Sequence, residues 1–200
     1  AAYDAMIAEF QSSGDKTWIE ATVVIDGSTY ERVGIRLKGN SSLMGLRTGA
    51  NGGNAGNGGA ARAGGPGGGA TASTPNALPW LIRLDKYVDG QDHKGATELV
   101  VRSNSSQSSL NEAVALELLG LSGQAIQKSF ATRFSVNGSA EKLRLVVENP
   151  GDEWDDATFE NDGVLYKAES GGDYSYRGED AASYKEIFDQ ETDTDTENFA

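Results

Sequence analysis

The sequence predicts an α+β domain built from an antiparallel sheet with one principal helix and a glycine-rich insertion. Several short segments rich in β-branched and aromatic residues are joined by the turn dipeptides Asp26-Gly27 and Asn137-Gly138, which are typical of β-hairpins. One longer apolar segment, residues 109–119, has helical spacing and lies between the strand segments. Strands on both sides of a single long helix indicate helix-on-sheet packing.

The first part of the chain predicts a helix followed by a hairpin. Apolar residues recur at helical spacing over residues 2–11, and Gly14 ends this segment. Residues 18–25 and 30–37 flank the Asp26-Gly27 turn and are predicted to pair. Apolar and polar residues alternate in the second strand, which places Arg36 and Lys38 together on its solvent-facing side.

Residues 48–78 form a low-complexity insertion rich in Gly, Ala and Asn. Between residues 49 and 69, 11 of 21 positions are glycine. Such a segment has too few apolar side chains to pack a core, and we expect it to be disordered. It lacks the Gly-Lys-Ser/Thr ending of a phosphate-binding P-loop, so its glycines do not predict one.

The second half predicts further strands around the principal helix. Strands are expected over residues 80–85, 97–102, 130–136, 143–148 and 163–168, a helical turn over 154–159 and a helix over 184–188. Ser109 and Glu112 have the spacing of a capping box at the start of the principal helix. The predicted buried face of that helix consists of Leu110, Val114, Leu118 and Leu119.

Composition and charge exclude several classes of function. The chain has no cysteine and one histidine, His93, which rules out disulfides, thiolate metal sites and histidine-rich zinc sites. Its net charge is −13, and residues 150–200 alone carry 16 acidic and 3 basic residues. An acidic surface repels phosphate backbones, so we expect no binding to nucleic acid. No apolar run approaches the ~20 residues of a membrane span.

Several segments, in order, resemble the CotH family of spore-coat and secreted atypical protein kinases. The matching segments are VGIRLKGNSS at 33–42, LIRLDKY at 81–87, SSLNEAVA at 108–115, the strand and Val-Asn-Gly turn of 130–138, VVE at 146–148, LYKA at 165–168 and YSYRGED at 174–180. The order of predicted elements also describes a protein-kinase small lobe, in which strands precede a helix that presents a Glu and further strands lead to a hinge. The resemblance therefore implies a kinase-like small lobe.

The sequence departs from the family pattern at three places. Residues 139–142 replace an aromatic-Gly-aromatic stretch, and Asn111 stands where the family usually has Arg before the helix Glu. The Asp-containing catalytic loop and the Trp-Asp-x-Asp metal motif of the family are not found, so we expect them beyond Ala200. Asp156 and Asn161 have the spacing of a kinase catalytic loop but lack the preceding His-Arg. Residues 1–200 are thus interpreted as part of a CotH-type domain, with the acidic segment 150–200 leading toward a missing C-terminal lobe.

The resemblance implies a nucleotide site whose cations neutralise phosphate charge. The candidate nucleotide-binding residues are Arg36, Lys38, Asn40, Ser41, Arg83, Glu112 and Glu148. Arg83 is interpreted as the strand cation that a kinase places before its helix, and Glu112 as the helix carboxylate that holds it. Glu148 lies at the expected hinge. Four of these residues also have a plain structural explanation: Lys38, Arg83 and Glu148 as exposed strand residues, and Glu112 as part of the capping box.

The function implied by the resemblance is ATP-dependent phosphorylation of coat or extracellular proteins. ATP and Mg²⁺ (or Mn²⁺) are the expected cofactors, and we expect this chain alone to lack transferase activity. The resemblance and the absence of cysteine favour an extracellular, cell-surface or spore-coat location in a bacterium. Two alternatives remain open: a non-catalytic coat or surface module on a kinase-like scaffold, and a calcium-dependent module using Asp193, Asp195 and Glu197, which lack the glycine and distal Glu of an EF-hand loop.

Overall fold

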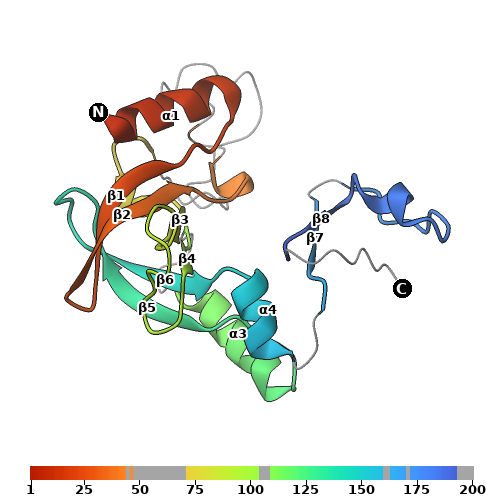
Figure 1. Ribbon diagram of the computed structural model, residues 1–200. Coiled ribbons are helices and arrows are strands. Elements are labelled where there is room, and N and C mark those ends of the chain that lie inside the picture. Colours follow the sequence, from red (N-terminus) through yellow and green to blue (C-terminus); the bar gives the residue numbers. More distant parts are fainter. Residues whose placement is uncertain (44–45, 47–70, 104–108, 160–162, 170–171, 193–200) are drawn as a thin grey trace, which may run out of the picture. The chain divides into compact units, whose positions relative to one another are not determined.

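The computed structural model describes residues 1–43, 46, 71–103, 109–159, 163–169 and 172–192 (Figure 1). The chain divides into two compact units, residues 1–148 and 149–200, and each is described by itself. Most of the predicted insertion at 48–78 and the acidic residues 193–200 lie outside the described residues.

The first unit is built on a curled antiparallel sheet of six strands in the order β1-β2-β3-β4-β6-β5 (Figure 1). The strands are β1 (Ile19–Ile25), β2 (Ser28–Leu37), β3 (Trp80–Arg83), β4 (Glu98–Val101), β5 (Ser129–Phe134) and β6 (Lys142–Glu148). The two predicted hairpins are confirmed, because β1 pairs with β2 and β5 pairs with β6. Asp26, Gly27, Asn137 and Gly138 all have the positive φ angles that such tight turns require. The predicted α+β class is therefore confirmed.

Helix α1 (Ala2–Ser13) covers one face of this sheet. Met6, Ile7 and Phe10 are buried in a cluster with alternate residues of the strands, among them Val33, Trp80 and Leu99. The helix ends at Gly14, which has the left-handed conformation of a C-cap, as the sequence predicts. The hydroxyl of Tyr3 donates a hydrogen bond of 2.6 Å to the carbonyl oxygen of Ala72.

Residues 71–78 also pack into this unit, although their sequence predicts that they belong to the disordered insertion. They form the short helix η2 (Pro75–Ala77), and the side chain of Leu78 is fully buried. Arg144 on β6 explains this order, because its guanidinium donates hydrogen bonds to the carbonyl oxygens of Asn76 and Leu78. Composition identifies the glycine-rich segment but not this anchor at its end.

Helix α3 (Asn111–Leu121) packs against the opposite face of the sheet, and two predictions about it are wrong. Ala113 and Leu116, not the predicted leucines, contact the buried cluster of this face. Because apolar residues lie on several sides of the helix, its sequence does not mark one face for burial. The residues predicted to be buried are largely exposed: Leu110, Val114, Leu118 and Leu119.

The predicted capping box is the second error. The N-cap position of α3 is Leu110, and no side chain caps the helix. Ser109 instead donates a hydrogen bond of 3.3 Å from its hydroxyl to the carbonyl oxygen of Leu143. Glu112 is therefore not held as a capping residue.

The second unit contains α4 (Asp152–Thr158), β7 (Tyr166–Ala168), the 3₁₀ helix η3 (Ala181–Tyr184) and β8 (Phe188–Gln190). The helical turn near 154–159 is confirmed, and the strand predicted at 163–168 is present in its second half. The helix predicted at 184–188 is wrong, since β8 begins at Phe188 and pairs with β7. The sequence of this short segment has no clear periodicity, so pairing with β7 decides its structure. Within the described part of the chain, no helix has the length and apolarity needed to cross a membrane.

Candidate functional site

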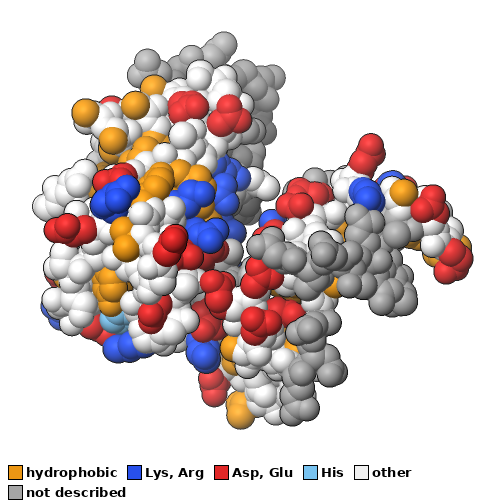
Figure 2. All heavy atoms as spheres, viewed as in Figure 1, with side chains coloured by type: hydrophobic (Ala, Val, Ile, Leu, Met, Phe, Trp, Pro, Cys, Tyr) orange, Lys and Arg blue, Asp and Glu red, His pale blue; other side chains and the backbone are white. Residues whose placement is uncertain are grey.

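Arg36, Arg83 and Arg102 lie on the face of the sheet that α3 covers. Successive side chains of a strand point to opposite faces, and directly paired residues point to the same face. Arg36 pairs with Leu81, and Leu81 pairs with Val100, whose side chain belongs to the buried cluster on the α3 side. By the same alternation, Arg83 and Arg102 lie on this face. Figure 2 shows Lys and Arg side chains gathered around hydrophobic ones on the visible face of the first unit. We call this surface the arginine face.

An apolar floor lies beneath the arginine face. It consists of four side chains that are at most 2% exposed: Leu81, Val100, Leu145 and Val147. Trp18 packs against this floor, as do Ala113 and Leu116 of α3. Cationic groups around a floor of this kind are surrounded by less water than fully exposed ones, which strengthens their interaction with an anion.

Arg102 and Glu112 form an ion pair across the end of β4 and the first turn of α3. The distance from Arg102 Nη2 to Glu112 Oε1 is 2.8 Å, and the two side chains are 36% and 39% exposed. Glu112 is presented toward the sheet because it lies one helical turn before Leu116, which packs on the apolar floor. Glu112 was predicted from the sequence, but its predicted partner was Arg83. The available signal was position, since Arg102 ends the strand segment that directly precedes the helix.

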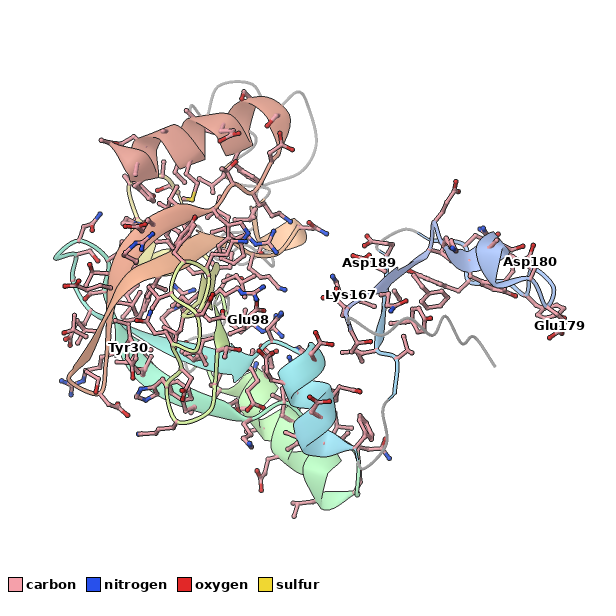
Figure 3. The ribbon with its side chains drawn as sticks, in the orientation of Figure 1. Tyr30, Glu98, Lys167, Glu179, Asp180 and Asp189 are labelled. Carbon is pink, nitrogen blue, oxygen red and sulfur yellow. The ribbon has the colours of Figure 1, made fainter. Side chains whose placement is uncertain are left out.

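Arg83 is engaged by two other carboxylates. Its Nε lies 2.9 Å from Asp85 Oδ1, and its Nη1 lies 3.6 Å from Glu98 Oε1. Glu98 lies directly opposite Arg83 on β4, and Figure 3 shows it among the side chains of this face. An anionic ligand approaching Arg83 would therefore compete with Asp85 and Glu98. Among the described residues Arg102 has one carboxylate partner, Glu112, and is the better candidate for neutralising phosphate.

Arg36 stacks on Trp18, which was not among the residues predicted for the site. The guanidinium carbon of Arg36 lies 4.8 Å from the centre of the Trp18 ring, and Lys86 Nζ lies 5.3 Å from it. Both contacts are cation–π interactions, which hold the two cations beside the apolar floor. Gly34 makes this packing possible, because a Cβ at this position would lie 2.6 Å from Lys86 Cβ and 3.1 Å from the Trp18 ring.

The residues after β2 form a turn near the same end of the sheet. The backbone N–H of Lys38 donates a hydrogen bond of 3.2 Å to the carbonyl oxygen of Pro79, and Gly39 has a φ of +105°. Asn40 Oδ1 accepts a hydrogen bond of 2.8 Å from Lys16 Nζ. Ser41 begins the short helix η1 (Ser41–Leu43). If the Asn40 side chain contacted phosphate, as predicted, its hydrogen bond with Lys16 would have to break.

Glu148 does not lie with the three arginines. It pairs with Leu99 at the end of β6, and this register places its side chain on the α1 side of the sheet. Glu148 Oε2 accepts a hydrogen bond of 2.7 Å from the backbone N–H of Lys128, and the Glu148 carbonyl oxygen accepts one of 2.7 Å from Gln127 Nε2. The structure thus gathers Arg36, Arg83 and Glu112, and it separates Glu148 from them.

The described residues contain no group of three or more His, Asp or Glu side chains arranged to hold a metal ion. Asn161 and the acidic residues Asp193, Asp195 and Glu197 lie outside the described residues. No protein-family model matches the sequence, and no curated protein aligns with it significantly. The resemblance to the CotH family therefore stays an expectation from the sequence motifs and their order.

Proposed function

We propose that this chain is the nucleotide-binding part of an atypical Ser/Thr protein kinase of the CotH type. The observation that carries the proposal is the ion pair between Arg102 and Glu112. In protein kinases a cation on the strand before the helix binds the ATP phosphates, and a helix Glu holds that cation in place. Here β4 directly precedes α3, and the pair joins these two elements.

The arrangement of strands supports the same proposal. After α3 the chain returns through β5 and β6, and β6 inserts beside β4 in the middle of the sheet. The strand that leads out of the first unit therefore lies next to the strand that carries the cation. A nucleotide on the arginine face would contact Arg102 with its phosphates. The Trp18–Arg36 stack adds a second cation beside that floor.

ATP with Mg²⁺ or Mn²⁺ is the ligand that this proposal requires. The metal supplies charge neutralisation on the phosphate oxygens. The protein groups that would hold the complex are Arg102 and Arg36, while Glu112 keeps the Arg102 guanidinium in position. Phosphoryl transfer requires a catalytic Asp and metal-binding carboxylates, which we expect outside this chain. The proposed substrates are coat or extracellular proteins of a bacterium, at its surface or in its spore coat.

Nucleotide titration of the full 200-residue chain tests the proposal. We expect saturable binding of ATP by calorimetry in the presence of Mg²⁺, weakened by about tenfold in Arg102→Met, which corresponds to about 1.4 kcal/mol. Arg133→Met is the matched control, because Arg133 is 84% exposed on the edge strand β5 and its removal should leave affinity unchanged. The proposal fails if ATP does not bind, or if both variants bind it as the wild type does. Either result would favour the non-catalytic coat or surface module.

A further inference from the structure

A cavity of about 730 Å³ lies in the first unit on the other face of the sheet from the arginine face. It is bounded by the two edge strands, β1 and β5, and by the loop that contains His93. These edge strands approach each other because the sheet curls, as Figure 1 shows. The cavity has the volume of a typical small-molecule site, for which about 300–1,000 Å³ is usual.

The walls of the cavity are mainly aliphatic and aromatic. The edge strands contribute Val23 and Ile25 on one side and Phe130 and Phe134 on the other. The ring of Phe130 is 44% exposed, which is unusual for a phenylalanine beside a core. The floor is continuous with the buried core of the unit and consists of Ile82, Leu99, Val101 and Val146.

Charged residues are confined to the rim, and each cation there is paired with a carboxylate. Lys94 Nζ lies 2.8 Å from Asp26 Oδ2, and Lys128 Nζ lies 3.6 Å from Glu148 Oε1. The hydrogen bond from Lys94, together with its charge, lowers the pKa of Asp26. The third cation of the lining, Arg133, lies 3.9 Å from Glu141 Oε2.

His93 is also engaged at the rim. Its Nδ1 lies 2.8 Å from the hydroxyl of Tyr30, and its Nε2 lies 3.5 Å from Asp26 Oδ2. Figure 3 marks Tyr30 beside the β1–β2 hairpin. The side chain of His93 is only 12% exposed, so it is part of the packed rim and not a solvated turn residue. A ligand with a net charge would have to compete with these existing pairs, whereas an uncharged one would not.

We propose that this cavity binds an uncharged amphiphile with an aliphatic body, such as a medium-chain alcohol, ester or amide. The aliphatic lining of the cavity would bury the hydrocarbon chain of the ligand. The charged groups of the rim already pair with one another, so the polar end of the ligand needs no charge. This site lies on the opposite face of the sheet from the arginine face and does not depend on the proposed nucleotide function.

Calorimetric titration of the full chain with octan-1-ol and with octanoate tests the chemistry of the ligand. The two probes have the same chain length and differ in the charge of the polar end. We expect octan-1-ol to bind at least about tenfold more tightly, a difference of about 1.4 kcal/mol. Octanoate binding that equals or exceeds that of the alcohol, or no binding of octan-1-ol, would overturn the proposal.

Substitutions on β5 test the location. Thr132 pairs with Arg144, so its side chain faces the cavity. The adjacent Ala131 also borders the cavity, but it pairs with Leu145, so its side chain points to the other side of the sheet. Thr132→Trp should fill the cavity and weaken octan-1-ol binding by about tenfold or more, and Ala131→Trp should not. Ala96→Leu fills the cavity from the loop that contains His93. Its effect on octan-1-ol binding tests the location if the Thr132→Trp variant does not fold. Equal weakening by Ala131→Trp, or none by the filling variants, would place the ligand elsewhere and contradict the proposal.

Discussion

Arg144 donates a hydrogen bond of 2.9 Å from its Nε to the backbone carbonyl oxygen of Arg102. The side chain of Arg144 is 1% exposed, and burial lowers its pKa to about 10. Its hydrogen-bond acceptors among the described residues are backbone carbonyls, of Asn76, Leu78 and Arg102. One buried guanidinium therefore fixes both the end of the glycine-rich insertion and the strand end that presents Arg102 to Glu112.

Replacement of Arg144 by methionine should destabilise the first unit strongly. The variant leaves buried carbonyl oxygens without donors, and we expect a loss of about 3 kcal/mol in the free energy of unfolding. Urea denaturation followed by circular dichroism measures this loss. Arg133→Met is the control, since an exposed position should change stability by less than about 0.5 kcal/mol. Equal denaturation midpoints for the two variants would contradict the role assigned to Arg144.

The Arg102–Glu112 pair should contribute little to stability. Both side chains are more than one third exposed, so a double-mutant cycle with Arg102→Met and Glu112→Gln should give a coupling of about 0.5 kcal/mol. The same two substitutions should weaken ATP binding if the pair serves the proposed site. A coupling energy above about 2 kcal/mol would instead identify the pair as a structural element, because exposed pairs do not reach that value.

The elements that depend on local signals were predictable from the sequence. The two turns have the residues that positive φ angles require, and Gly14 ends α1 as a glycine C-cap does. The face of α3 was not predictable, because apolar residues surround this helix and only tertiary packing selects Ala113 and Leu116. The site was predicted in part. Glu112 was found from its helix position, and its partner Arg102 could have been found because it ends the strand segment directly before that helix. The stacking of Trp18 with Arg36 depends on strand register, which sequence alone does not determine.

Gly34 is expected to tolerate no side chain. A Cβ at this position would lie 2.6 Å from Lys86 Cβ, an atom fixed to the backbone, so Gly34→Ala must displace Lys86 or Trp18. We expect a loss of about 1–3 kcal/mol in the free energy of unfolding, typical of overpacking. Gly151→Ala is the control, because a Cβ at Gly151 would meet no other atom within 4 Å and the φ angle of Gly151 is not positive. Gly90→Ala is unsuitable, because the φ of +72° at Gly90 would strain any other residue. Urea midpoints that agree between Gly34→Ala and Gly151→Ala would contradict this close packing.

The exposed apolar positions of α3 predict an asymmetry between neighbouring leucines. The Leu118 side chain is 67% exposed, so Leu118→Gln should change stability by less than about 0.5 kcal/mol. Leu116 contacts the apolar floor of the arginine face, and Leu116→Gln should cost about 2 kcal/mol. Thermal denaturation of the two variants compares them directly. A larger loss for Leu118→Gln would mean that the originally predicted face of the helix is the buried one.

Stability at alkaline pH should depend on Tyr3. Burial raises the pKa of Tyr3 to about 12 from the usual value of 10.0, with a smaller contribution from the charge of Asp4. Above pH 10 the unfolded chain loses this proton first, so the unfolded state binds fewer protons and the free energy of unfolding falls as pH rises toward 12. The folded state also needs the proton, because the hydroxyl donates to the Ala72 carbonyl oxygen. Tyr3→Phe removes this titration.

The stability difference between wild type and Tyr3→Phe should therefore shrink as pH rises from 9 to 11, measured as urea midpoints at each pH. A difference that stays constant over this range would show that Tyr3 ionises equally in the folded and unfolded states. In that case the hydrogen bond from the Tyr3 hydroxyl to the Ala72 carbonyl oxygen would not be what attaches residues 71–78 to α1. Absorbance titration of the phenolate in both proteins provides an independent check, because the transition assigned to Tyr3 should be missing from the variant.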